Sequence, residues 1–98
     1  MNELLKLLLA AAAITAIAVI ILNWDSITNW FYVNKTNDAQ LGKLIREGLS
    51  NGNYNLVGGI FNQQGALTHK NSWENVKLSD DVLSKFGDSN VIEINLSN

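Results

Sequence analysis

The chain has 98 residues, no cysteine, and seven Lys and Arg against nine Asp and Glu, which gives a formal charge of −2. Without thiols it can form neither disulfides nor thiolate metal sites. The scattered bases argue against a nucleic-acid partner, because such binding depends on clustered Lys and Arg. The length allows one small domain after an apolar N-terminal segment, and a domain this small has a thin stability margin that a partner surface would reinforce.

The first element is an apolar segment, in which Lys6 and Thr15 are the only polar side chains between residues 4 and 22. Its part without a charged side chain, residues 7–22, has 16 residues, which falls just short of a membrane span. If Lys6 places its ammonium group at the lipid headgroups, the whole of residues 4–24 can belong to the span. As a helix these residues are about 31 Å long, which matches a hydrocarbon core of about 30 Å. The sequence therefore predicts a single transmembrane anchor over residues 1–24.

Aromatic residues crowd just beyond this segment, where amphipathic rings suit the interface between membrane and water. The alternative is that these rings belong to the core of the following domain. Asp25 and Ser26 interrupt them, which favours the interfacial interpretation, so residues 25–36 are predicted to be an interfacial linker. The predicted membrane-interface residues are Lys6, Trp24, Trp30, Phe31 and Tyr32.

A cleaved signal peptide is the alternative to a retained anchor. The small residues that cleavage needs lie inside the apolar run rather than after it, which favours the anchor. The short, weakly positive N-terminus predicts that the domain is extracytoplasmic, either periplasmic or extracellular. Small residues at helical spacing also form a candidate helix-packing face, although alanine that merely fills an apolar run is the simpler explanation. This face consists of Ala11, Ala12, Thr15, Ala16 and Ala18.

The soluble domain, placed at residues 37–98, is predicted to begin with an amphipathic helix over Thr36–Leu49. Leucine and isoleucine fall on one face of this helix and charged residues on the other, and the Asn51-Gly52 turn ends it. A strand over Tyr54–Phe61 follows, in which Gly58-Gly59 indicates a bulge or the close approach of another backbone or a ligand.

The second half of the domain is predicted to contain two more strands and a helix. A four-residue loop from Asn62 to Gly65 leads into a strand that runs from Ala66 to Leu78. Ser79 caps a helix that Gly87 ends, and Asn90–Leu96 alternates as a half-buried strand. The predicted fold class is α+β: one N-terminal transmembrane helix and a small α-β-β-α-β domain with a three-stranded sheet, whose open edges suit strand addition by a partner.

No catalytic, cofactor-binding or metal site is predicted. His69 is the only histidine, and Ser72 and Asp80-Asp81 allow a Ser/His/Asp set on paper, but triads are recognised by geometry rather than by spacing. The polar neighbours of His69 favour a solvent-facing loop. Acidity at a helix start explains the two aspartates without a metal ion.

We therefore expect a non-enzymatic, single-pass membrane protein whose domain acts as a protein-interaction module or an accessory subunit of a membrane or envelope complex. The expected partners are membrane lipid and either another protein or a second copy of the chain, without nucleic acid or a cofactor. Two alternatives are a phage or bacterial envelope regulator of the antiholin type and a secreted domain with a cleaved signal peptide. An enzyme that uses His69 is a further hypothesis and is less favoured.

Overall fold

Seven elements follow one another in the computed structural model, which describes residues 21–97. They are β1 (Ile21–Leu22), α2 (Trp24–Asn34), β2 (Ala39–Gly48), β3 (Tyr54–Asn62), β4 (Leu67–Leu78), α3 (Asp80–Phe86) and β5 (Val91–Asn95).

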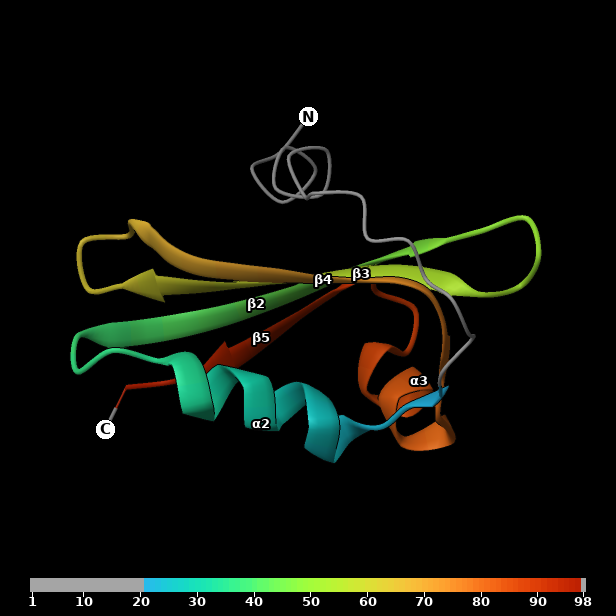
Figure 1. Ribbon diagram of the computed structural model, residues 1–98, viewed down its shortest axis with the longest axis horizontal. Helices are drawn as coiled ribbons and strands as arrows, with labels where there is room; N and C mark the ends of the chain where they lie inside the picture. Colours follow the sequence, from blue (N-terminus) through green and yellow to red (C-terminus); the bar gives the residue numbers. More distant parts are fainter. Residues whose placement is uncertain (1–20, 98) are drawn as a thin grey trace.

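All five strands belong to one sheet with the order β1-β4-β3-β2-β5. β2, β3 and β4 are antiparallel neighbours, β5 returns to pair with the far side of β2, and β1 pairs in parallel with the end of β4. Figure 1 shows both helices on the same side of this sheet. We call that side the helix face and the opposite side the back face, and side chains alternate between the two along each strand.

Helix α2 begins and ends at signals that are local in the sequence. The side chain of Asn23 caps it by accepting a hydrogen bond from the backbone N–H of Ser26 at 2.8 Å. Asp25 lies in the first turn, where the helix dipole favours an anion. Ile27 and Phe31, four residues apart, are fully buried, so α2 packs one face on the sheet.

Phe31 lies in a space that two glycines of the sheet leave open. A methyl group added at Gly42 of β2 would lie 2.8 Å from two ring carbons of Phe31, and one added at Gly58 of β3 would lie 3.1 Å from Cζ of the same ring. Trp30 and Trp73 meet edge to face beside this ring, with centroids 5.9 Å apart. The groups that come close to Gly58 are therefore aromatic side chains, rather than the backbone or ligand that the sequence predicted.

Asparagine side chains hold the turn between β2 and β3 against β4. The amides of Asn51 and Asn53 both donate to Oδ1 of Asn75 at 3.0 Å. The backbone N–H of Asn75 donates to Oδ1 of Asn55 at 2.9 Å. Asn75 has a φ of 54°, a left-handed conformation that asparagine adopts more readily than most residues. The network thus stabilises an irregular position of β4.

The predicted fold class was wrong, because the sheet has five strands rather than three. Residues 36–49, predicted as a helix, contain β2, which pairs with β3 on one side and β5 on the other. Leu44 and Ile45 point to opposite faces and both are buried. A strand that is buried on both faces loses its alternating pattern and can be mistaken for an amphipathic helix.

The predicted membrane span was also drawn wrongly at its C-terminal end. Leu22 pairs with Leu78 and belongs to the core, and Asn23 caps α2. Within residues 21–97, neither helix has the length and apolar character that crossing a membrane requires. The remainder of the predicted span, residues 4–20, lies outside the described residues.

The predicted elements from Tyr54 onward are confirmed. The predicted strands correspond to β3, β4 and β5, and the loop between β3 and β4 closes where the N–H of Asn62 donates to the carbonyl of Ala66 at 3.0 Å. Helix α3 follows Ser79 and ends at Gly87, which has a φ of 54°. In each case the turn or cap is encoded by a few adjacent residues.

Candidate interaction surfaces

The described residues predicted at a membrane interface occupy different environments. Phe31 is fully buried, Trp24 and Trp30 are half-buried against the core, and Tyr32 is exposed. Their role at a membrane stays a prediction. Lys6 and the predicted packing face, Ala11, Ala12, Thr15, Ala16 and Ala18, lie outside the described residues.

The residues considered for catalysis do not converge. His69 lies in β4 rather than in a loop, opposite Ile60, while Ser72 lies opposite Val57. Ile60 belongs to the core under the helices, and residues three apart in a strand point to opposite faces. His69 and Ser72 are thus separated by the sheet. Between residues 21 and 97, no three His, Cys, Asp or Glu residues gather as metal ligands.

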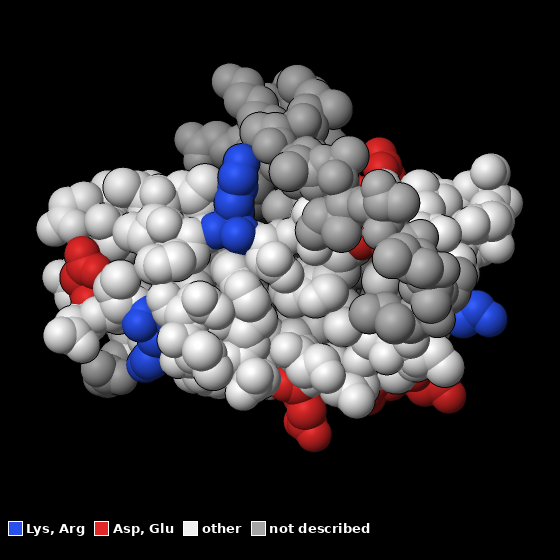
Figure 2. All heavy atoms as spheres, viewed as in Figure 1, with Lys and Arg blue, Asp and Glu red and all other residues white. Residues whose placement is uncertain are grey.

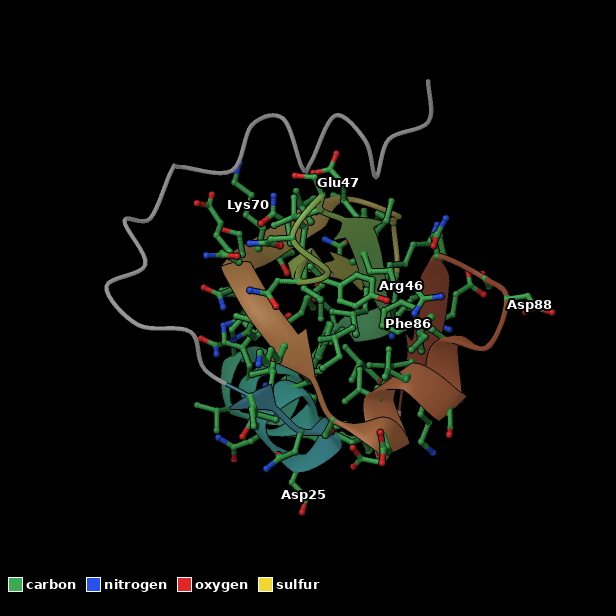
Figure 3. All side chains as sticks on the ribbon, turned by 90° about the vertical axis from the view of Figure 1, so that its right-hand side faces the viewer. Asp25, Arg46, Glu47, Lys70, Phe86 and Asp88 are labelled. Atoms are coloured by element: carbon green, nitrogen blue, oxygen red, sulfur yellow. The ribbon has the colours of Figure 1, made fainter. Side chains whose placement is uncertain are left out.

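The back face consists of three rows of paired residues that run across β5, β2, β3 and β4. The first row is Val91, Ile45, Val57 and Ser72, the second is Glu93, Lys43, Gly59 and Lys70, and the third is Asn95, Leu41, Phe61 and Leu67. The outer rows are mainly apolar, whereas the middle row is charged around a central glycine. Figure 3 shows Lys70 and Glu47 on this side, away from the helices.

Lys43 lies over the third row of the back face. Its Nζ is 4.0 Å from a carboxylate oxygen of Glu93 and 5.5 Å from the centroid of the Phe61 ring. Such a position lets the lysine cover apolar surface while its charge stays near water. Because the ion pair is partly exposed and long, we assign it little stabilising energy.

The outer edge of β5 carries backbone groups that point away from the sheet. On the inner side, Asn90 accepts from the N–H of Arg46 at 2.9 Å and Leu96 donates to the carbonyl of Gln40 at 3.1 Å. Along an antiparallel strand, residues whose N–H and C=O groups point toward one neighbouring strand alternate with residues whose groups point away from it. The N–H and C=O groups of Val91, Glu93 and Asn95 therefore point away from β2.

Ser89 occupies one end of this edge. Its hydroxyl group donates to the carbonyl of Val91 at 3.0 Å and accepts from the N–H of the same residue at 3.1 Å. The outward groups of Glu93 and Asn95 are therefore the open part of the edge, which we call the β5 edge.

Arg46 fixes the chain that leads into β5. Its guanidinium carbon lies 4.6 Å from the centroid of Phe86 and 5.4 Å from that of Tyr54. Figure 3 shows the side chains of Arg46 and Phe86 close together. The same group donates to the carbonyl of Gly87 at 3.1 Å and to Oδ1 of Asn90 at 3.2 Å. Cation–π stacking and a fork of donors hold the end of α3 to the start of β5.

Charge does not gather on the molecular face that Figure 2 shows. Among the described residues on that face, basic and acidic side chains are isolated from one another by uncharged surface. This face therefore offers backbone groups and apolar contacts for recognition rather than a charged patch.

No family model, curated protein or solved structure matches the chain. Its function is therefore inferred from the β5 edge and the back face alone. Sequence reasoning anticipated open edges but not the back face, because the helix predicted at residues 36–49 removed β2 from the sheet. The adjacent apolar pair Leu44-Ile45 was the signal for a strand buried on both sides.

Proposed function

We propose that the chain is a non-enzymatic interaction module that binds an extended segment of a partner protein along the β5 edge. The observation that carries this proposal is the outward direction of the backbone groups of Glu93 and Asn95, which follows from the hydrogen bonds of Asn90 and Leu96 to β2. An exposed strand edge of this kind accepts an added strand through main-chain hydrogen bonds.

The side chains beside the β5 edge add a means of selecting the partner sequence. Ile92 and Ile94 point to the helix face, whereas Val91 and Glu93 point to the back face. Alternate side chains of an added strand would therefore meet apolar contacts on one face and a mixed surface on the other. In strand addition, such alternate contacts provide specificity while the backbone provides affinity.

A proline at position 93 tests the proposal. Proline removes only the outward N–H, because that group makes no bond to β2, and proline is tolerated on edge strands. Glu93→Ala is the matched control, since it removes the same carboxylate and the same ion pair with Lys43 but keeps the N–H. We would select peptides from a random display library on the full chain and locate them by NMR shift perturbation.

We expect the selected peptides to perturb β5 and to bind Glu93→Pro roughly 5- to 150-fold more weakly than Glu93→Ala, because a hydrogen bond lost without replacement costs about 1–3 kcal/mol. Urea denaturation should show both variants folded. Equal affinity of the two variants, or binding that maps to other strands, would show that the β5 edge is not the site.

A further inference from the structure

The turn between β2 and β3 contains the only Asn-Gly pair of the sequence, Asn51-Gly52. Figure 1 shows this turn at the right-hand end of the sheet. The backbone nitrogen that follows an asparagine can attack the side-chain amide carbon, and glycine favours this reaction because it has no side chain to block it. Both residues are exposed, and a methyl group added at Gly52 would meet no atom within 4 Å. The pair is therefore a chemically reactive group that water reaches.

The reaction is deamidation, and it needs no reactant other than water. A bond forms between the backbone nitrogen of Gly52 and Cγ of Asn51, while the bond between Cγ and Nδ2 breaks. The attacking nitrogen gives its proton to water, and Nδ2 leaves as ammonia after taking up a proton. Water then opens the cyclic imide. Opening at Cγ gives aspartate, whereas opening at the main-chain carbonyl gives isoaspartate, in which the backbone passes through the side chain.

Three hydrogen bonds hold the pair in an arrangement that opposes this reaction. The N–H of Gly52 donates to the carbonyl of Leu49 at 3.1 Å, so an anion at that nitrogen would face a carbonyl oxygen. Nδ2 of Asn51 donates to Oδ1 of Asn75 at 3.0 Å, and Oδ1 of Asn51 accepts from the N–H of Asn53 at 2.9 Å. Attack requires a defined approach of the nitrogen to Cγ, which a side chain bonded at both ends reaches only by giving up these bonds.

We propose that Asn51 is a deamidation site that the hydrogen bonds to Asn75 restrain, so that it reacts only when the turn between β2 and β3 opens away from β4. Local opening of this kind does not require the whole chain to unfold. Because hydrolysis of the imide does not restore the amide, each reaction is irreversible.

The product does not fit the place that Asn51 leaves. A carboxylate cannot donate to Oδ1 of Asn75, and its charge would face that acceptor. The same oxygen also accepts from Nδ2 of Asn53 at 3.0 Å. Turning the Asn75 amide to suit the carboxylate would therefore set its amino group against that of Asn53, and one buried donor would lose its partner. Deamidation thus converts a transient opening of the turn into a lasting release from β4.

Peptide mass spectrometry of the full chain, aged in mildly alkaline buffer, tests the proposal. A synthetic peptide of residues 47–57 gives the rate of the unrestrained pair. Asn75→Gly and Asn75→Asp are the matched variants, because both residue types tolerate the positive φ at this position and only aspartate keeps the oxygen acceptor. Leu22→Ala removes a core side chain that makes no bond to the turn, and it serves as the control for global unfolding.

We expect the peptide to deamidate at Asn51 roughly 5- to 150-fold faster than the wild-type chain, which is the ratio that two lost hydrogen bonds produce. Asn75→Gly should approach the rate of the peptide, whereas Asn75→Asp and Leu22→Ala should stay close to the wild type. In Asn51→Asp, which carries one of the products, the N–H of Gly52 should exchange with solvent faster than in the wild type, because the turn no longer closes.

Four outcomes would overturn the proposal. Equal rates in the peptide and the wild type would show that the fold does not restrain the pair. Equal rates in Asn75→Gly and Asn75→Asp would assign the restraint to other contacts. If Leu22→Ala reacts as fast as Asn75→Gly, the reaction proceeds through global unfolding. Unchanged exchange in Asn51→Asp would show that the modified turn still closes on β4. If Asn75→Gly does not fold, the comparisons of the wild type with the peptide and with Asn51→Asp still decide.

Discussion

Gly42 decides whether α2 can pack on the sheet. A methyl group added at this residue would lie 2.8 Å from two ring carbons of Phe31. Nonbonded carbon atoms do not approach one another so closely. The Phe31 ring is fully buried, so it cannot move aside without displacing its neighbours in a core that is packed as densely as a crystal. The absence of a side chain at Gly42 thus allows α2 to pack close to the sheet.

We predict that Gly42→Ala destabilises the fold by about 1–3 kcal/mol, the usual cost of overpacking a core. Gly48→Ala is the matched control in the same strand, where the added methyl group meets only Tyr54 at 3.8 Å. There we expect no loss, or a gain of about 0.4–1 kcal/mol from the stiffer unfolded chain. Urea denaturation followed by tryptophan fluorescence measures both. Equal stability of the two variants would contradict the packing of Phe31 described above.

At the scale of elements, Asp81 links the starts of the two helices. One carboxylate oxygen accepts from the backbone N–H of Trp24 at 3.3 Å, and the other accepts from the N–H of Val82 at 2.9 Å and from the Ser79 hydroxyl. The hydrogen bond from Ser79 is the main cause that lowers the pKa of Asp81; desolvation opposes it, and the backbone N–H groups of Trp24, Val82 and Asp81 itself assist it. Ser79, predicted as the cap of α3, therefore acts through this aspartate.

We predict that Asp81→Asn makes the fold less sensitive to acid. A carboxyl group whose pKa is lower in the folded state stabilises the fold above its unfolded pKa of about 3.9, and this contribution disappears as the pH falls through the folded pKa. The variant should therefore be less stable than the wild type at pH 6, and the difference should shrink as the pH falls below about 4.

Urea denaturation at a series of pH values measures this effect. Asp80→Asn is the control, because it removes a carboxylate from the same helix turn without touching the junction with Trp24. If the difference between Asp81→Asn and the wild type stays constant down to pH 2, the contacts of Asp81 do not depend on its charge.

At the scale of the whole molecule, β1 ties the N-terminal end of the described residues to the core. Leu22 is 4% exposed and packs in the core, whereas its neighbour Ile21 is 69% exposed. The backbone N–H of Ser79 donates to the carbonyl of Leu22 at 3.1 Å, which connects the N-terminal end of the described chain with the start of α3. The residue that joins the apolar segment to the domain is therefore a structural part of the domain.

We predict that Leu22→Ala destabilises the fold by about 2–4 kcal/mol through the cavity that it leaves, and that Ile21→Ala changes stability by less than about 0.5 kcal/mol. The two substitutions are adjacent and chemically similar, so their comparison in urea isolates the effect of burial. If Leu22→Ala is as mild as Ile21→Ala, the folded domain does not include β1.

Most elements whose signals lie within a few adjacent residues were predicted correctly, whereas elements that depend on pairing between distant residues were not. α3, between Ser79 and Gly87, and the loop that ends at Gly65 were predicted correctly because each signal spans a few residues. Helix α2 was missed although Asn23, Asp25 and Ser26 carry an ordinary N-terminal signal, because their aromatic neighbours were assigned to a membrane interface. The open edges were anticipated, but the identity of the edge strand required the pairing of β5 with β2.

The sequence by itself determined the turn between β3 and β4, the ends of α3, the three strands from Tyr54 onward and the apolar character of residues 4–20, since these depend on local backbone preference and composition. Only the tertiary structure decided that residues 39–48 form a strand, that Leu22 belongs to the core and that the back face has an apolar centre. The reason is that β2 is held by partners on both sides and buried on both faces. In β2, pairing with residues distant in the chain overrides the local sequence pattern. The need for a glycine at position 42 becomes apparent only in the folded structure, where Phe31 lies over it.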